Sequence, residues 1–198
     1  MPPDMLLSLF TIAMASAWTP GPNNALVAAS GVNFGLRRSL PHVAGIALGF
    51  SFMILMVGFF LGELFRQSLM LREALRWGGA ALLLWVSWKI ATAGGLGAGG
   101  GRARPFTFTE AAAFQWINPK AWVMALAISA QFVRAEAPMV SALWVALVFI
   151  AAGFTSAFGW AAAGLALRRW LGDPLRLRIF NITMGATIAL GVVWLFVE

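Results

Sequence analysis

Six hydrophobic runs divide this chain, and short polar or glycine-rich stretches separate them. The runs cover roughly residues 5–29, 41–63, 74–93, 108–133, 139–166 and 177–197. Each run holds about 20 or more mainly apolar residues, which is the length of α-helix needed to cross a hydrocarbon core about 30 Å thick. The pattern therefore predicts an all-α integral membrane protein with six transmembrane helices in a lipid bilayer.

A glycine-rich stretch separates the third run from the fourth. Six of the eight residues at 94–101 are glycine, a composition typical of a flexible linker rather than of a packed segment. The sequence thus predicts two repeats of three helices each, residues 1–93 and 108–198, joined by a flexible linker at 94–107.

Composition narrows the class of protein further. Hydrophobic residues make up 61% of the 198 residues and charged residues 11%, so little of the chain remains for a soluble domain. A net charge of +7 suggests nucleic acid in a soluble protein, but here the arginines lie at helix ends, and no nucleic-acid partner is expected. The chain has no cysteine, which excludes disulfides and thiolate metal sites, and neither a metal nor a cofactor is expected.

The basic residues predict the orientation in the membrane. With the N-terminus outside, the inner loops carry nine of them: Arg37, Arg38, Lys89, Arg102, Arg104, Arg168, Arg169, Arg176 and Arg178. The outer loops carry four: Arg66, Arg72, Arg76 and Arg134. Because Lys and Arg concentrate on the cytoplasmic side, both termini are predicted to lie outside and the linker in the cytoplasm. The two halves then run in opposite directions, as in the 3+3 inverted repeats of secondary transporters.

The first predicted helix contains a break. Pro20 and Pro22 lack amide hydrogens and clash with the preceding turn, and Gly21 between them loosens the backbone, so an α-helix cannot continue through them. In a membrane, backbone groups freed in this way are tolerated only where they are buried in protein or line a polar cavity. The break therefore predicts a site.

The fourth predicted helix contains a second break. Asn118 followed by Pro119 is the residue pair expected for a helix N-cap and first helical position, so a new half-helix is predicted to start there. Pro22 opens a half-helix in the same way, which continues through Asn23 and Asn24. In opposed repeats both half-helix N-termini point at the membrane centre, where their partial positive charges and free amides favour an anion.

Lys120 adds a full positive charge beside the second break. An ionisable group in mid-membrane costs roughly 2.5–3.5 kcal/mol and is a functional hypothesis by default, with a substrate carboxylate as its counterion. The alternative is that the Lys120 side chain extends to the membrane–water interface or forms an ion pair with Glu110, ten residues away. Polar side chains that could complete the pocket, or else bond between helices, are Asn23, Asn24, Gln115, Asn118 and Asn181. His42 is expected at a helix end near the inner face rather than as a ligand or a proton relay.

These motifs resemble the lysine/homoserine exporter (LysE/RhtB) superfamily. The resemblance rests on Thr19-Pro20-Gly21-Pro22-Asn23 in the first helix, on Asn118-Pro119-Lys120-Ala121 in the fourth, and on six helices in 198 residues. It extends to Gly35-Leu36-Arg37, to Gly45 with Gly49, and to Asn181 with Gly185. Glu110 and Gln115 depart from the more apolar sequence expected before the fourth-helix motif, which leaves the substrate open.

The resemblance implies an exporter of amino acids or close derivatives in the bacterial cytoplasmic membrane, driven by the proton motive force and often taken to be a homodimer. Matching the motifs residue by residue points to Pro20, Pro22, Asn23, Asn118, Pro119 and Lys120 as substrate-binding residues. The reasoning from the breaks adds Gly21, Asn24, Gln115 and Asn181. Proton coupling is assigned to Lys120 or Glu110.

We expect an exporter of small zwitterionic amino acids that works by alternating access, and three other interpretations fit the sequence less well. An exporter of another solute, such as a metal cation, conflicts with two converging positive helix ends. An intramembrane enzyme needs a nucleophile with a base or a metal cluster, whereas the chain has one histidine and no cysteine or tyrosine. A purely structural subunit leaves both breaks unexplained. The protein is thus not expected to be an enzyme.

Overall fold

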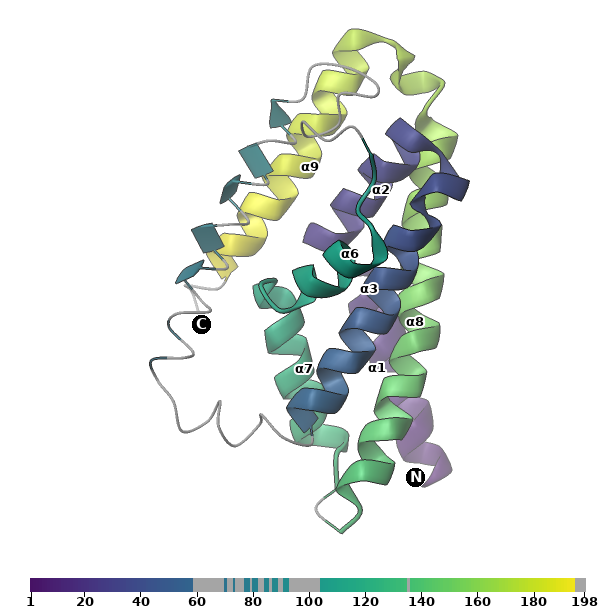
Figure 1. Ribbon diagram of the computed structural model, residues 1–198, viewed down its shortest axis with the longest axis vertical. Helices are drawn as coiled ribbons and strands as arrows, with labels where there is room; N and C mark the ends of the chain where they lie inside the picture. Colours follow the sequence, from purple (N-terminus) through teal and green to yellow (C-terminus); the bar gives the residue numbers. More distant parts are fainter. Residues whose placement is uncertain are drawn as a thin grey trace.

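The computed structural model describes residues 1–58, 104–134 and 136–194, together with scattered positions between 70 and 92. All regular secondary structure in these residues is helical. Figure 1 shows an elongated bundle in which the longest helix, α8 (Pro138–Leu167), runs along most of its length. The all-α prediction is confirmed for this part of the chain. Most of the predicted third helix and of the linker at 94–107 lies outside the described residues.

The first hydrophobic run forms two helices, α1 (Pro3–Trp18) and α2 (Pro22–Phe34). Between them Gly21 is fully extended and Pro22 opens α2, as the sequence predicts. The helix continues five residues past the predicted end at 29 and stops at Gly35, whose φ of 77° lies in the left-handed region that favours glycine.

The second helix begins earlier than predicted. Helix α3 covers Leu36–Met56, so Pro41 lies inside it rather than at its start. The run at 41–63 marks the apolar part of the helix and leaves out its first turn, which contains Arg37 and Arg38. A single proline in the second turn removes only one hydrogen bond, and the packing of the helix offsets that loss.

The fourth run also forms two helices, α6 (Phe108–Gln115) and α7 (Pro119–Phe132). A capping box starts α6: Thr107 Oγ1 accepts from the Glu110 N–H at 3.2 Å, and Glu110 accepts from the Thr107 N–H at 2.9 Å. The predicted second break is confirmed, because Asn118 is the N-cap of α7 and Pro119 is its first residue.

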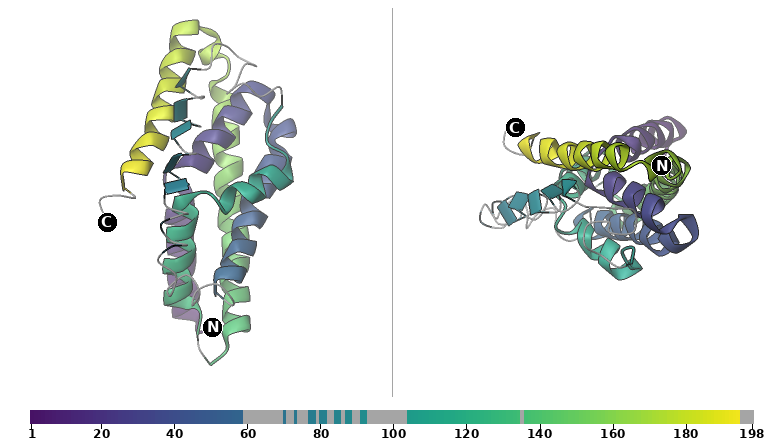
Figure 2. Two further views of the ribbon diagram at one scale, coloured as in Figure 1. Left: turned by 60° about the vertical axis from the view of Figure 1, so that its left-hand side comes forward. Right: turned by 90° about the horizontal axis from the view of Figure 1, so that it is seen from above.

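The chain ends with α8, a short 3-10 turn at Trp170–Gly172 and α9 (Pro174–Trp194). Helices α3 and α8, with 21 and 30 residues, are each long and apolar enough to cross a bilayer. The half-helices are shorter: α2 has 13 residues and α7 has 14, or roughly 20 Å each. Figure 2 shows α1, α2 and α3 gathered around α8 from two further directions.

Small residues let α2 and α8 approach at backbone distance. A Cβ added to Gly31 of α2 would collide with the backbone carbonyl oxygen of Ala161, and one added to Gly164 of α8 would collide with that of Ala28. Small residues have this role in membrane bundles, where van der Waals packing rather than the hydrophobic effect holds helices together. The α2–α8 contact therefore fixes the position of the half-helix that begins at the first break.

Gly31→Ala tests this contact. The added methyl group must separate two backbones, so we expect destabilisation of about 1–3 kcal/mol and a lower melting temperature in detergent. Gly172→Ala is the control, because nothing lies within 4 Å of a Cβ placed there. Equal melting temperatures for the two variants would contradict the assigned packing role.

Candidate functional site

The two breaks meet at a cavity of about 60 Å³. A cavity needs roughly 10–15 Å³ to hold one water molecule, and each water takes about 30 Å³ in the liquid, so this cavity has room for about two water molecules. Its walls come from α1, α2, α3, α6, α7, α8 and the break residues. They are Ser16, Ala17, Gly21, Asn23, Asn24, Ile46, Phe50, Gln115, Asn118, Lys120, Ala121, Met124, Phe149, Gly153, Ser156 and Ala157.

Lys120 joins the two breaks directly. It is the second residue of α7, and its Nζ donates to the backbone carbonyl of Thr19 at 2.7 Å. The side chain passes over Gly21, where an added Cβ would lie 3.0 Å from Lys120 Cδ and 3.1 Å from its Nζ. A glycine at position 21 thus leaves the space that the ammonium occupies.

The first break exposes two carbonyls that receive four hydrogen bonds. Asn24 Nδ2 donates to Ala17 O at 3.1 Å and to Thr19 O at 2.9 Å. Ser156 Oγ of α8 donates to Ala17 O at 2.7 Å, and Lys120 gives Thr19 O its second bond. The Ala17 and Thr19 carbonyls, which have no helical partner at the break, are thereby satisfied by side chains from three helices.

Asn23 and Gln115 form a pair of amides across the two breaks. Asn23 Nδ2 donates to Gln115 Oε1 at 2.8 Å, and Gln115 Nε2 donates back to Asn23 Oδ1 at 3.3 Å. Gln115 is fully buried, and its Nε2 also donates to the Ala111 carbonyl at 2.8 Å. The pair connects the start of α2 to the end of α6.

The two half-helix N-termini differ in their capping. In α7, Asn118 Oδ1 accepts from the Lys120 N–H at 3.2 Å. In α2 the N-cap is Gly21, which has no side chain to accept from the first-turn amides. The α2 end thus presents open amide donors and partial positive charge to the cavity, and the α7 end presents an ammonium group.

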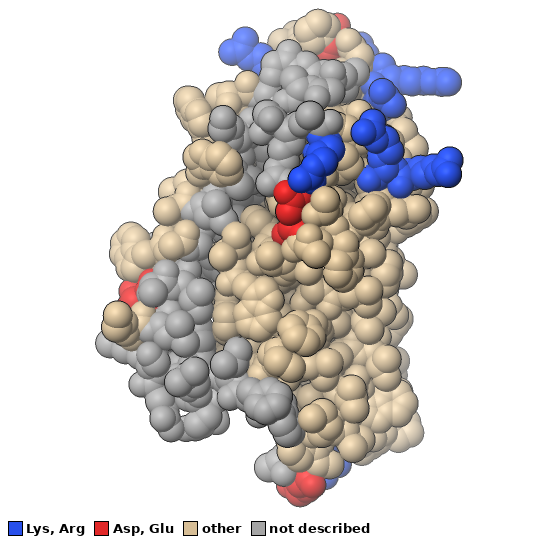
Figure 3. All heavy atoms as spheres, in the orientation of Figure 1, with Lys and Arg blue, Asp and Glu red and all other residues tan. Residues whose placement is uncertain are grey.

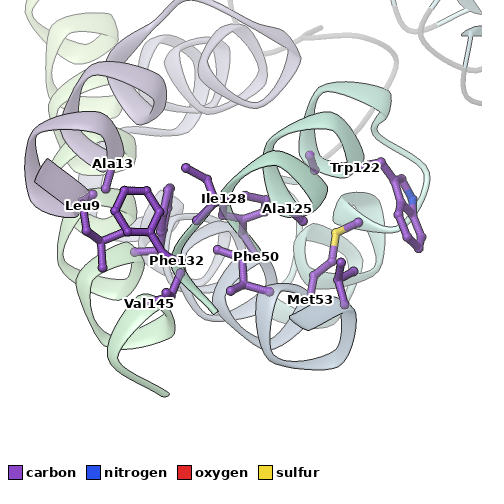
Figure 4. Close-up of a cluster of buried hydrophobic side chains, with 14 residues drawn as sticks. Leu9, Ala13, Phe50, Met53, Trp122, Ala125, Ile128, Phe132 and Val145 are labelled. Atoms are coloured by element: carbon purple, nitrogen blue, oxygen red, sulfur yellow. The ribbon is translucent and has the colours of Figure 1, made fainter. Parts of the chain in front are cut away.

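Two hydrophobic clusters lie on either side of the cavity. The larger one, here called the α7 cluster, joins α1, α3, α7 and α8 and is shown in Figure 4. It contributes Phe50, Ala121 and Phe149 to the cavity wall. The smaller one, the α6 cluster, consists of Val27, Val43, Ile46, Ala111, Ala157 and Ala161. It contributes Ile46 and Ala157 to the wall, so packed side chains of both clusters form part of the cavity lining.

The structure brings together six of the predicted site residues, namely Gly21, Asn23, Asn24, Gln115, Asn118 and Lys120. Pro20, Pro22 and Pro119 shape the backbone at the breaks, and neither Pro20 nor Pro22 is among the residues that line the cavity. Asn181 is buried in α9, which packs on α2, and it too lies outside the cavity wall. The binding roles of all these residues stay predictions.

Glu110 lies at the start of α6, away from the cavity wall. It pairs with Arg104 at 2.7 Å and completes the capping box of α6. The hydrogen bond and the negative charge of Glu110 raise the pKa of the Arg104 guanidinium. This placement supports a structural role for Glu110 rather than the predicted role in proton coupling.

Sequence reasoning missed the residues that α3 and α8 contribute to the cavity wall. Ser156 is a hydroxyl in the middle of a long apolar helix, and that contrast is a signal that could have singled it out. Phe50 and Phe149, which meet edge to face at 5.4 Å, carry no such signal because phenylalanine is common in membrane helices.

Comparison with known proteins gives a consistent result. The sequence model of the LysE type translocator family matches residues 14–197. The cysteine/O-acetylserine efflux proteins of Escherichia coli K12 and of Shigella sonnei are each 33% identical to this chain over 175 residues. The match covers 85% of this chain and 87% of either relative, and the efflux protein of the same name from Shigella flexneri serotype 5b matches equally well. No solved structure matches.

Asn24→Asp tests how the first break is held. The substitution keeps the shape of the side chain but replaces its donor with an acceptor, so Ala17 O and Thr19 O each lose a bond and face a carboxylate. We expect a loss of at least about 1–3 kcal/mol of stability, measured as a lower melting temperature in detergent. Asn118→Asp is the matched control, because its Oδ1 acts as an acceptor and a carboxylate keeps that bond. Similar losses in both variants would argue against the donor role of Asn24.

Proposed function

The chain belongs to the LysE type translocator family, and we propose that it exports small neutral amino acids, or close derivatives of them, across the bacterial cytoplasmic membrane. The single observation that carries this proposal is the cavity at the two helix breaks, where Lys120 and the open N-terminus of α2 converge. Both groups favour a carboxylate, which every free amino acid carries.

The proposed topology is the six-helix 3+3 inverted repeat with both termini outside. Figure 3 supports the orientation, because Lys and Arg side chains gather at the end where α2 meets α3 and α8 meets α9. Arg37 and Arg38 at the start of α3, and Arg168 and Arg169 at the end of α8, belong to this basic end. The positive-inside tendency makes it the cytoplasmic end. A homodimer, as the resemblance implies, stays a prediction.

The proposed binding step is an exchange of partners at Lys120. In the structure its ammonium donates to the Thr19 carbonyl, which is a neutral acceptor. A carboxylate is the stronger acceptor for an ammonium group, and the free amides of α2 stabilise its second oxygen. Binding of the substrate therefore releases Thr19 from α7 and loosens the link between the two breaks.

The remaining cavity walls select the substrate's side chain. Ile46, Phe50, Met124 and Phe149 are apolar and leave a small space, whereas Asn23 and Gln115 offer amide groups on the other side. Such walls favour a short, uncharged side chain that makes one or two hydrogen bonds. The relatives named for efflux of cysteine and O-acetylserine are consistent with this size and charge.

The two clusters are the proposed gates of an alternating-access cycle. Opening the α6 cluster connects the cavity with the cytoplasmic end, and opening the α7 cluster connects it with the outside. A metal cation in place of the amino acid conflicts with the ammonium and the positive helix end at the site. An enzyme remains the less favoured alternative, since the matching family is one of translocators.

Lys120→Met tests the carboxylate site. The variant keeps a similar chain length but removes the charge, and loss of a hydrogen bond from a charged group costs about 1.5–3 kcal/mol. We expect amino-acid binding to weaken on the order of 10- to 100-fold and export from everted vesicles to stop at low substrate concentration. Arg134→Met is the control, because it removes a positive charge from an exposed residue at the end of the bundle opposite to the basic end. Unchanged export by Lys120→Met would refute the mechanism.

A panel of amino acids tests the proposed selectivity. Purified protein in proteoliposomes is loaded with labelled cysteine, O-acetylserine, serine, lysine, arginine or tryptophan. We expect saturable exchange of the small neutral compounds and none of the basic or large ones, because a second cation faces Lys120 and a large ring does not fit the cavity. Preferred exchange of lysine or arginine would contradict the proposal that the cavity selects a short, uncharged side chain.

A further inference from the structure

His42, the one histidine of the chain, lies buried between helices rather than at a membrane surface. It is in the second turn of α3 and only 1% exposed. Its Nδ1 lies 2.9 Å from Ser30 Oγ of α2, and its ring stacks on Phe106 with centroids 5.0 Å apart and planes 28° from parallel. One imidazole thus joins α3, α2 and the segment that enters α6.

This group of three residues lies between the cavity and the basic end of the bundle. Ile46, which lines the cavity, is one helical turn along α3 from His42. Ser30 is seven residues, or about two turns, along α2 from Asn23, which also lines the cavity. Phe106 packs against the α6 cluster. A path from the basic end to the cavity along α2 and α3 passes these contacts.

We propose that His42 is the proton-responsive positioning residue of the cytoplasmic gate, which the contact among Ser30, His42 and Phe106 holds closed. This inference rests on the proposed export function, because a gate has meaning only for a transported solute. A neutral imidazole bonds to Ser30 and stacks on Phe106 within a dry interior. A proton turns both ring nitrogens into donors and places a charge there, which water stabilises better than packed side chains do. The protonated ring therefore favours the open gate.

The charged groups on the surrounding helices act in the same direction. Arg37 and Arg38 precede His42 on α3, and Arg38 lies one turn away, so both disfavour a second cation in the closed arrangement. Arg104 and Glu110, near Phe106, form an ion pair with each other. Helices α2 and α8 carry no charged residue within Pro22–Phe34 and Pro138–Leu167.

A cycle with proton antiport follows from these contacts. With the α7 cluster open, a proton from the outside reaches a ring nitrogen of His42 through the cavity and favours opening of the cytoplasmic gate. The proton then leaves to the cytoplasm, the substrate enters, and the neutral ring closes the gate behind it. One proton moves inward for each amino acid that moves outward: hydronium on the outer side gives its proton to a ring nitrogen, and the N–H bond breaks again when water on the cytoplasmic side takes the proton.

His42→Gln tests this proposal in proteoliposomes that contain the full chain. Glutamine can still bond to Ser30 but does not titrate. The first measurement is exchange of labelled cysteine at equal pH on both sides, and the second is cysteine transport driven by a pH gradient. We expect near wild-type exchange with His42→Gln and a driven rate that falls to the level seen without a gradient. A driven component that persists would overturn the proposal, and so would loss of exchange in a variant that melts like the wild type.

Ser30→Ala keeps the test decisive if His42→Gln does not fold. Removing the hydroxyl weakens the closed gate. As the pH is lowered, we therefore expect the exchange rate to begin its rise at a higher pH than in the wild type. An unchanged pH profile would overturn the gate. Failure of the proposed function has a different signature, because the wild type itself would then show no saturable exchange, and Lys120→Met would behave as the wild type does.

Discussion

The structure depends on how the backbone carbonyls left without helical partners at a break inside a membrane helix are satisfied. Ala17 O and Thr19 O lose helical partners at the first break, and in a hydrocarbon environment each would otherwise cost several kcal/mol. Asn24, Ser156 and Lys120 supply the donors. At the second break Trp122 Nε1 donates to Trp116 O at 2.8 Å. The cavity therefore exists where α1, α2, α7 and α8 must converge to keep the backbone hydrogen-bonded.

This requirement gives the proposed binding groups a second, structural role. In the structure Lys120 donates a hydrogen bond to the Thr19 carbonyl instead of to a substrate carboxylate, and Asn23 and Gln115 hydrogen-bond to each other. A substrate that binds here replaces existing hydrogen bonds rather than adding to an empty surface, so its net binding energy is a difference between similar terms. Such an arrangement suits a transporter, which must release its solute as readily as it binds it.

Both breaks could be predicted from the sequence because their cause is local. Proline breaks a helix wherever the packing of that helix does not offset the backbone hydrogen bond that proline removes. The pair Asn118-Pro119 is a helix start signal in any environment. The partners that stabilise the breaks could not be predicted in the same way. Ser156 lies 139 residues from Ala17, and although its hydroxyl stands out in an apolar helix, the sequence does not indicate which released carbonyl it will meet. For the same reason Asn181 and Glu110, chosen by residue type alone, proved to lie away from the cavity wall.

The cavity walls also explain how binding can be communicated to both gates. Phe50 and Phe149 belong to the cavity and to the α7 cluster, whereas Ile46 and Ala157 belong to the cavity and to the α6 cluster. Close-packed interiors shift between discrete arrangements rather than deform smoothly, so a change in the wall on one side disturbs the packing of that cluster as a unit. Lys120 lies at the start of α7 and bonds to the break between α1 and α2. A ligand that draws the Lys120 ammonium away from Thr19 acts on α7 and on the start of α2 at once. The far ends of these two helices belong to the two proposed gates.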